Sequence, residues 1–140
     1  MTEAYAGDLT PAQAWELLGQ VGHAVLVDVR TQAEWQFVGL PDVSDHGRDT
    51  ALIAWQVYPN MNISPGFVDR LAEAAPDKTA PVMFLCRSGV RSQAAAAAAT
   101  AAGYAKAYNI LEGFEGGPNA DQQRGKVGGW KVAGLPWRQG

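Results

Sequence analysis

The chain has 140 residues, of which 47% are hydrophobic and 18% are charged. This length suits one domain, so we interpret residues 1–140 as a single domain. The apolar content excludes a disordered chain. The net charge of −3 argues against a surface that binds nucleic acid. One cysteine excludes an intramolecular disulfide and a multi-cysteine metal site.

The sequence also predicts the compartment of the protein, together with the absence of a membrane span, a secretory signal, a metal and a cofactor. No run approaches ~20 apolar residues, so we expect no membrane span. The segment Met1–Leu9 carries Glu3 and Asp8 but no basic cluster, so we expect no secretory signal. A lone thiol suits a reducing compartment, which predicts a cytoplasmic protein. The histidines match no ligand pattern, so we expect no metal. We also expect that the protein needs no cofactor.

The first half of the chain alternates between helix and strand patterns. Thr10 followed by Pro11 is typical of a helix start, and Gln13 can complete a capping box. The apolar run 24–29 is typical of a strand that is buried on both faces. In chain order, the predicted elements are a helix 10–18, a strand 24–29, a short helix 31–37, a polar loop Gly39–Thr50 and a strand 51–57.

The second half continues the alternation. Ser64-Pro65 predicts another helix start, and Gly103 closes an alanine-rich helix at the usual C′ position. The predicted elements are a turn 60–64, a helix from 65 to about 75, a strand 81–85, a helix 92–102, a strand 107–111, a glycine-rich loop Gly113–Gly129 and a final turn 130–133. This order predicts an α/β fold with a mainly parallel central sheet flanked by helices.

Several polar residues should meet at one edge of that sheet. In open α/β sheets, ligands bind beyond the carboxyl ends of the strands. Cys86 ends one predicted strand, Asp28 and Arg30 end another, and Trp55 lies near the end of a third. Glu34 stands four residues after Arg30, a spacing that favours an ion pair on a helix surface. For Arg30, that pair and a role in supporting the site both remain open.

The segment between the strand ending at Cys86 and the next helix is the most informative part of the sequence. It comprises Cys86, Arg87, Ser88, Gly89, Val90, Arg91 and Ser92. A thiol before a helix faces the positive end of the helix dipole and free N–H groups. The two arginines add positive charge, and both effects favour the nucleophilic thiolate. Gly89 lets the loop curl so that its N–H groups converge. The segment predicts a thiolate in an anion-binding cradle.

This loop resembles the active-site loop of rhodanese-type sulfurtransferases. Three further segments are similar to family motifs and occur in the family's order. They are Leu26–Arg30 with Glu34-Trp35, then Gly103-Tyr104 with Tyr108–Gly113, then Gly129-Trp130 with Gly134–Pro136. Two segments depart from the pattern: Val38–Pro41 stands where the family usually has Gly-His-Ile, and the glycine-rich loop is longer. The resemblance implies a rhodanese-like three-layer fold.

The resemblance also implies a persulfide mechanism. Cys86 would take the sulfane sulfur from a small anionic donor such as thiosulfate. A thiol, cyanide or protein acceptor would then remove it. Arg87 and Arg91 would attract and help to hold the donor, and the loop amides would stabilise the persulfide charge. The chain has no second cysteine, so the sulfur must leave to an outside acceptor.

Two other functions remain as alternatives. Cysteine-dependent phosphatases use a similar cradle, but their cysteine and arginine are separated by five residues, whereas Cys86 and Arg91 are separated by four. A smaller loop favours sulfur over a phosphoryl group. A non-catalytic binding module would be expected to lack the cysteine. The oligomeric state and the roles of the two long loops remain open.

Overall fold

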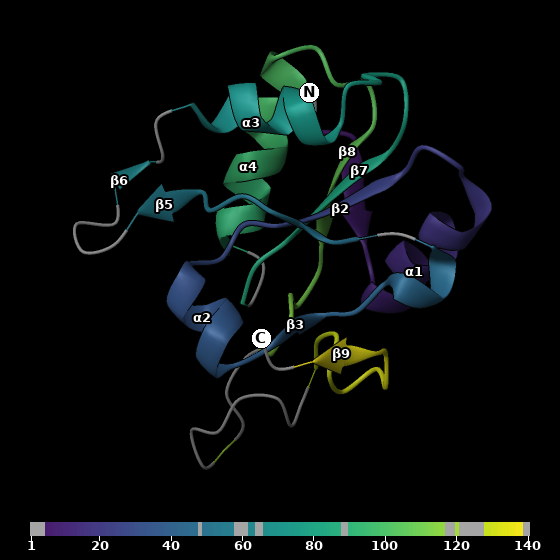
Figure 1. Ribbon diagram of the computed structural model, residues 1–140, viewed down its shortest axis with the longest axis vertical. Coiled ribbons are helices and arrows are strands. Elements are labelled where there is room, and N and C mark those ends of the chain that lie inside the picture. The colour runs from purple at the N-terminus through teal and green to yellow at the C-terminus, as the bar shows by residue number, and fades with distance from the viewer. Residues whose placement is uncertain are drawn as a thin grey trace.

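A parallel sheet lies at the centre of the computed structural model, which describes residues 5–47, 49–57, 62–63, 66–87, 90–116, 120 and 128–138 (Figure 1). Within this part of the chain, its neighbouring strands are β1 (Gly7–Leu9), β8 (Ala107–Ile110), β7 (Val82–Leu85), β2 (Val25–Asp28) and β4 (Ala51–Leu52), in that order. Every pairing between them is parallel. Their carboxyl ends therefore share one edge, and the predicted α/β fold is confirmed.

Helices cover both faces of this sheet, which gives the fold three layers. Helices α3 (Phe67–Ala74) and α4 (Val90–Ala101) pack on the face that carries Val27 and Phe84. Helix α1 (Pro11–Gln20) packs on the face that carries Leu26 and Met83. Successive residues of a strand point to opposite faces, so β2 and β7 contribute to both cores. This explains why both strands read as continuous apolar runs.

Shorter elements surround the main sheet. Helix α2 (Gln32–Phe37) follows β2, and a 3-10 turn, η1, spans Ser44–His46. Strand β3 (Leu40–Pro41) pairs antiparallel with β9 (Trp137–Arg138), and β5 (Gln56–Val57) pairs antiparallel with β6 (Asn62–Ile63). Trp130, just before β9, is fully buried, and its Nε1 donates to the Pro136 carbonyl over 2.7 Å. Trp130 thus belongs to the core, whereas both residues of β9 are exposed.

Local hydrogen bonds explain several helix boundaries. Thr10 and Thr31 each cap a helix through a capping box, with Gln13 and Glu34 as the reciprocal partners. At the end of α4, Gly103 has a φ of 105°. Its N–H donates to Thr100, and the next N–H donates to the Ala99 carbonyl. This is the Schellman arrangement, and it confirms the predicted stop.

The structure differs from the sequence-based prediction at several boundaries. The predicted strand 51–57 is two short strands, β4 and β5. Helix α3 begins at Phe67 after a left-handed Gly66, whereas Ser64 and Pro65 lie outside the described residues. Helix α4 begins at Val90 rather than Ser92. Strands β1, β3, β6 and β9 were not predicted. Each has two or three residues, too few to show a hydrophobic period.

Candidate active site

Cys86 lies where the sequence placed it, directly after β7 and shortly before α4. Only 1% of its surface is exposed. Ser88 and Gly89 lie outside the described residues, and Val90 is the first residue of α4. The predicted anion-binding cradle therefore stays a prediction. The sulfur is buried at the carboxyl edge of the sheet, before the amino end of a 12-residue helix whose dipole favours negative charge.

Ser92 contacts the sulfur through its hydroxyl group. Its Oγ lies 3.2 Å from the Cys86 Sγ, and the residue is fully buried. Helix α4 packs against β7 and β8, so the position of this hydroxyl follows from the helix–sheet contact. The sequence predicts Ser92 at the start of the helix 92–102, and the structure places it in the first turn of α4, which begins at Val90.

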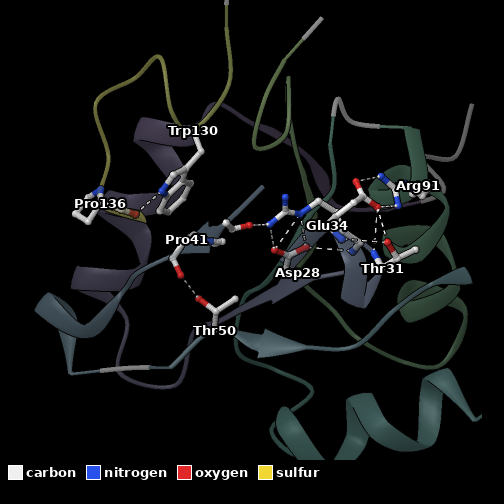
Figure 2. A network of polar contacts seen from close by, with 10 residues as sticks. Asp28, Thr31, Glu34, Pro41, Thr50, Arg91, Trp130 and Pro136 are labelled. Atoms are coloured by element: carbon white, nitrogen blue, oxygen red, sulfur yellow. Dashed lines mark hydrogen bonds and ion pairs between the residues drawn. The ribbon is translucent and has the colours of Figure 1, made fainter. Parts of the chain in front are cut away.

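Arg91 is engaged by a carboxylate from another helix. Its Nη1 and Nη2 donate to the two carboxylate oxygens of Glu34 over 2.6 and 2.8 Å. Figure 2 shows Glu34 between Arg91 and the Thr31 cap of α2. A bidentate pair of this kind fixes the orientation of both side chains. The expectation that Glu34 pairs with Arg30 is therefore wrong, because the fold brings Arg91 to it from 57 residues away.

This pair also determines the charge of both partners. Burial alone would raise the pKa of Glu34. The hydrogen bonds and charge of Arg91, together with the hydrogen bonds of Thr31, instead lower this pKa from 4.5 to about 2. The hydrogen bond from Glu34 in turn raises the pKa of Arg91. Glu34 and Arg91 are thus ionised together at neutral pH.

Asp28 and Arg30 form a second ion pair, which is fully buried. Arg30 Nη2 donates to Asp28 over 2.6 Å and to the Gly39 carbonyl over 2.7 Å. The same guanidinium lies 4.3 Å from the centre of the Phe114 ring. Arg30 therefore joins the end of β2 to the segments around Gly39 and Phe114. Because Arg30 has no exposed surface, it supports the neighbouring segments of the chain and does not bind a solute directly.

A glycine-rich turn after β8 holds the backbone of the cysteine segment. The Phe114 N–H donates to the Cys86 carbonyl over 2.8 Å, and the Glu115 N–H donates to the Arg87 carbonyl over 3.0 Å. Gly113 has a φ of 58°, and a Cβ there would lie only 2.3 Å from the Cys86 carbonyl oxygen. This turn needs a residue without a side chain. Its role was left open by the sequence, although the density of glycines is a signal of close backbone approach.

Trp55 is partly buried and packs against the buried apolar cluster that contains Cys86. Its ring meets that of Phe67 edge to face, with centroids 5.0 Å apart. This contact ties Trp55 to α3 and gives it a packing role. Arg87, by contrast, is exposed beside the buried cysteine.

Two residues of this region were missed by sequence reasoning. Asn109 is a buried polar residue inside β8, and Asp8 is its register partner in β1. A buried amide in an apolar strand is a signal in itself, because buried polar groups need partners. Asp8 gave no signal, since β1 has no strand pattern.

No described helix is long and apolar enough to cross a membrane. Nor does the described part of the chain bring three His, Cys, Asp or Glu side chains together as a metal ion would need.

The fold and this cysteine segment define a class of protein. The sequence profile of the rhodanese-like domain family matches residues 10–119, and the chain belongs to that family. The crystal structure of Rv0390 from M. tuberculosis is 50% identical, with a TM-score of 0.89, and the match covers 97% of this chain and 99% of that one.

Relatives with curated names extend the comparison. An uncharacterised protein of Rickettsia conorii is 39% identical over 94% of this chain and 96% of its own length. A protein named thiosulfate sulfurtransferase GlpE, from Actinobacillus succinogenes, is 30% identical over 92% of this chain and 87% of its own. The chain is thus related, at a distance, to thiosulfate sulfurtransferases.

Proposed function

We propose that this protein is a sulfurtransferase that carries a sulfane sulfur on Cys86. The observation that carries the proposal is the position of the single cysteine, between the carboxyl end of β7 and the amino end of α4. A helix amino terminus stabilises an anion at this place. The relationship to proteins named thiosulfate sulfurtransferase supports the same chemistry.

The reaction has two displacement steps. In the first, the Cys86 thiolate attacks the outer sulfur of thiosulfate, a new S–S bond forms, and the S–S bond of thiosulfate breaks. Sulfite leaves with the electron pair of the broken bond, and Cys86 carries a persulfide. In the second, an acceptor such as cyanide attacks the outer sulfur, thiocyanate leaves and the thiolate returns. Neither step needs an added oxidant or reductant.

The surrounding residues divide between donor binding and support. Arg87 is exposed and follows Cys86 directly in the chain, which suits it to attract an anionic donor. Arg91, whose guanidinium is held by Glu34, anchors the first turn of α4. Backbone N–H groups from Ser88 to Val90 are proposed to hold the negative charge of the persulfide. Asp28 and Arg30 support the cysteine segment indirectly, through the contact of Arg30 with Phe114.

The acceptor must come from outside the chain, because Cys86 has no partner cysteine in the sequence to displace its persulfide. The acceptor is therefore a small nucleophile or a thiol on another molecule.

Mass spectrometry of the intact protein tests this proposal. After incubation with thiosulfate, we expect the wild type to gain the mass of one sulfur atom, and we expect cyanide to remove it. The Cys86→Ser variant should gain nothing, because an alcohol at this place is a far weaker nucleophile. An unmodified wild type whose cysteine still alkylates rapidly would contradict sulfur transfer from this donor, and sulfur transfer by the serine variant would contradict the role of Cys86.

A further inference from the structure

A line of polar contacts connects Cys86 to the outer strand of the sheet. The Cys86 Sγ lies 3.2 Å from the Ser92 Oγ, which lies 2.5 Å from the Asn109 Oδ1. Asn109 Nδ2 donates to the Asp8 Oδ1 over 3.0 Å. Cys86, Ser92 and Asn109 are buried, whereas Asp8 is exposed. The line therefore runs from solvent to the sulfur.

Secondary structure holds each member of this line in place. Asp8 and Asn109 stand opposite each other in the parallel pairing of β1 with β8. Ser92 belongs to α4, which packs directly on β8. The Tyr5 hydroxyl also donates to Asp8 Oδ1, over 2.9 Å, so this carboxylate oxygen accepts from both Tyr5 and Asn109. The contacts are thus set by the sheet register and not by flexible side chains alone.

The direction of each hydrogen bond follows from the chemistry of Asp8. A carboxylate accepts hydrogen bonds and has none to donate. Asn109 must therefore turn its NH₂ group toward Asp8, which leaves its carbonyl oxygen toward Ser92. The Ser92 hydroxyl has a single proton, and it donates that proton to this oxygen. What Ser92 then presents to the sulfur of Cys86 is an oxygen lone pair.

We propose that Asp8 is a positioning residue that fixes Ser92 as a hydrogen-bond acceptor toward Cys86 and thereby restrains ionisation of the thiol. An oxygen lone pair beside the sulfur stabilises S–H and repels the thiolate. To donate to a thiolate, Ser92 would have to break its bond to Asn109. The inference rests on the proposed function, in which Cys86 is the sulfur carrier, and adds a control on its reactivity.

Other charged groups also act on this sulfur and stay the same in the variants below. They are Arg91 with Glu34, from α4 and α2, Asp28 with Arg30, at the end of β2, and the exposed Arg87.

The rate of alkylation by iodoacetamide, measured from pH 4 to 10 without any sulfur donor, tests the inference. An asparagine at position 8 can donate to the Asn109 oxygen, so the Asn109 amide can turn over and donate to Ser92. Ser92 is then able to donate to the thiolate. We expect Asp8→Asn to move the midpoint of the pH profile down by about one unit, the size of one added hydrogen bond to a charged group. The exposed Asp69→Asn on α3 is the charge-matched control and should leave the midpoint in place.

Removing the charge of Asp8 would by itself favour the thiolate, so two measurements separate this effect from the hydrogen-bond line. In 1 M NaCl the screening length is about 3 Å, which suppresses a long-range charge effect but leaves hydrogen-bond direction unchanged. We expect the shift to persist there. In a Ser92→Ala background, we expect Asp8→Asn to give no shift, because the connection to the sulfur is missing.

Three results would overturn the inference: no shift in Asp8→Asn, a shift that disappears in high salt, or a shift that remains in the Ser92→Ala background. The salt experiment needs only the exposed, isosteric variant, so the inference can be tested even if Ser92→Ala fails to fold. Because alkylation uses no sulfur donor, a wild type that takes no sulfur from thiosulfate would defeat the proposed function and leave this result unaffected.

Discussion

At the scale of single residues, the pairing of Arg91 is the feature that changes how the cysteine segment is understood. An arginine five positions after a nucleophilic cysteine suggests a binding group for an anion. In the structure its two terminal nitrogens are held by Glu34, and both side chains are about four-fifths buried. The pair connects α2 to the first turn of α4, so its charges stabilise the local structure beside Cys86.

The ionisation of Glu34 predicts how this stabilisation depends on pH. Its pKa falls from 4.5 to about 2 on folding, so the contribution is complete above about pH 4.5 and is lost as the pH falls through about 2. Glu34→Gln should lower the free energy of unfolding by about 1–2 kcal/mol at pH 7, after allowance for solvent screening. Urea titrations at pH 7 and near pH 2 measure the difference, which should be much smaller in acid.

The exposed Glu73→Gln on α3 is the control for this experiment, since it removes the same charge away from any such pair. Equal losses in the two variants, or a loss in Glu34→Gln that does not change with pH, would contradict the assigned role.

At the scale of elements, the turn after β8 holds the backbone of the cysteine segment in place. Its N–H groups donate to the carbonyls of Cys86 and Arg87. The approach is so close that only glycine fits at position 113. Arg30 lies over the ring of Phe114 in the same turn, so the buried Asp28–Arg30 pair stabilises this element and, through it, the segment that holds Cys86.

A methyl group at Gly113 should therefore disturb both stability and chemistry. Gly113→Ala combines a left-handed backbone with a clash against the Cys86 carbonyl, and should cost at least about 2 kcal/mol in the free energy of unfolding. Sulfur transfer should slow as the segment shifts. Gly22→Ala is the matched control, because a Cβ there meets nothing within 4 Å. Urea denaturation and a thiocyanate assay compare the two, and similar results for both variants would refute this account.

At the scale of the whole molecule, the overall charge opposes the proposed substrate. The chain has a net charge of −3, and thiosulfate is an anion. Attraction must therefore be local, and we propose that it comes from Arg87, which is exposed and follows Cys86 in the chain. A single exposed charge a few ångströms from an anion in water contributes about 1 kcal/mol.

Two alkylating reagents of different charge measure this attraction without a sulfur donor. Arg87→Ala should slow the reaction of Cys86 with anionic iodoacetate by about three- to fivefold relative to neutral iodoacetamide. The effect should shrink at high salt because exposed charges are screened. Arg70→Ala on α3 changes the net charge equally and should leave the ratio unchanged. An unchanged ratio in Arg87→Ala would remove Arg87 from donor binding.

Much of the fold was predictable from local patterns. The buried strands β2 and β7 show as apolar runs, and the capping box at Thr10 and the stop at Gly103 follow from residues adjacent in sequence. Strands β1 and β9 were missed because they form by pairing with distant segments and not from their own periodicity. The split of 51–57 into two strands was missed for the same reason, since β4 is set by its pairing with β2.

The sequence by itself determined the candidate nucleophile, Cys86, and its setting, because a cysteine between an apolar strand and a helix start depends only on neighbouring residues. Only the tertiary structure decided what surrounds the sulfur. Glu34 reaches Arg91, Asn109 reaches Ser92, and Gly113 lies against the Cys86 carbonyl, each across a long stretch of chain. Contacts of this kind come from the register of parallel strands and the packing of helices on the sheet, which bring together residues whose spacing in the sequence carries no periodic signal.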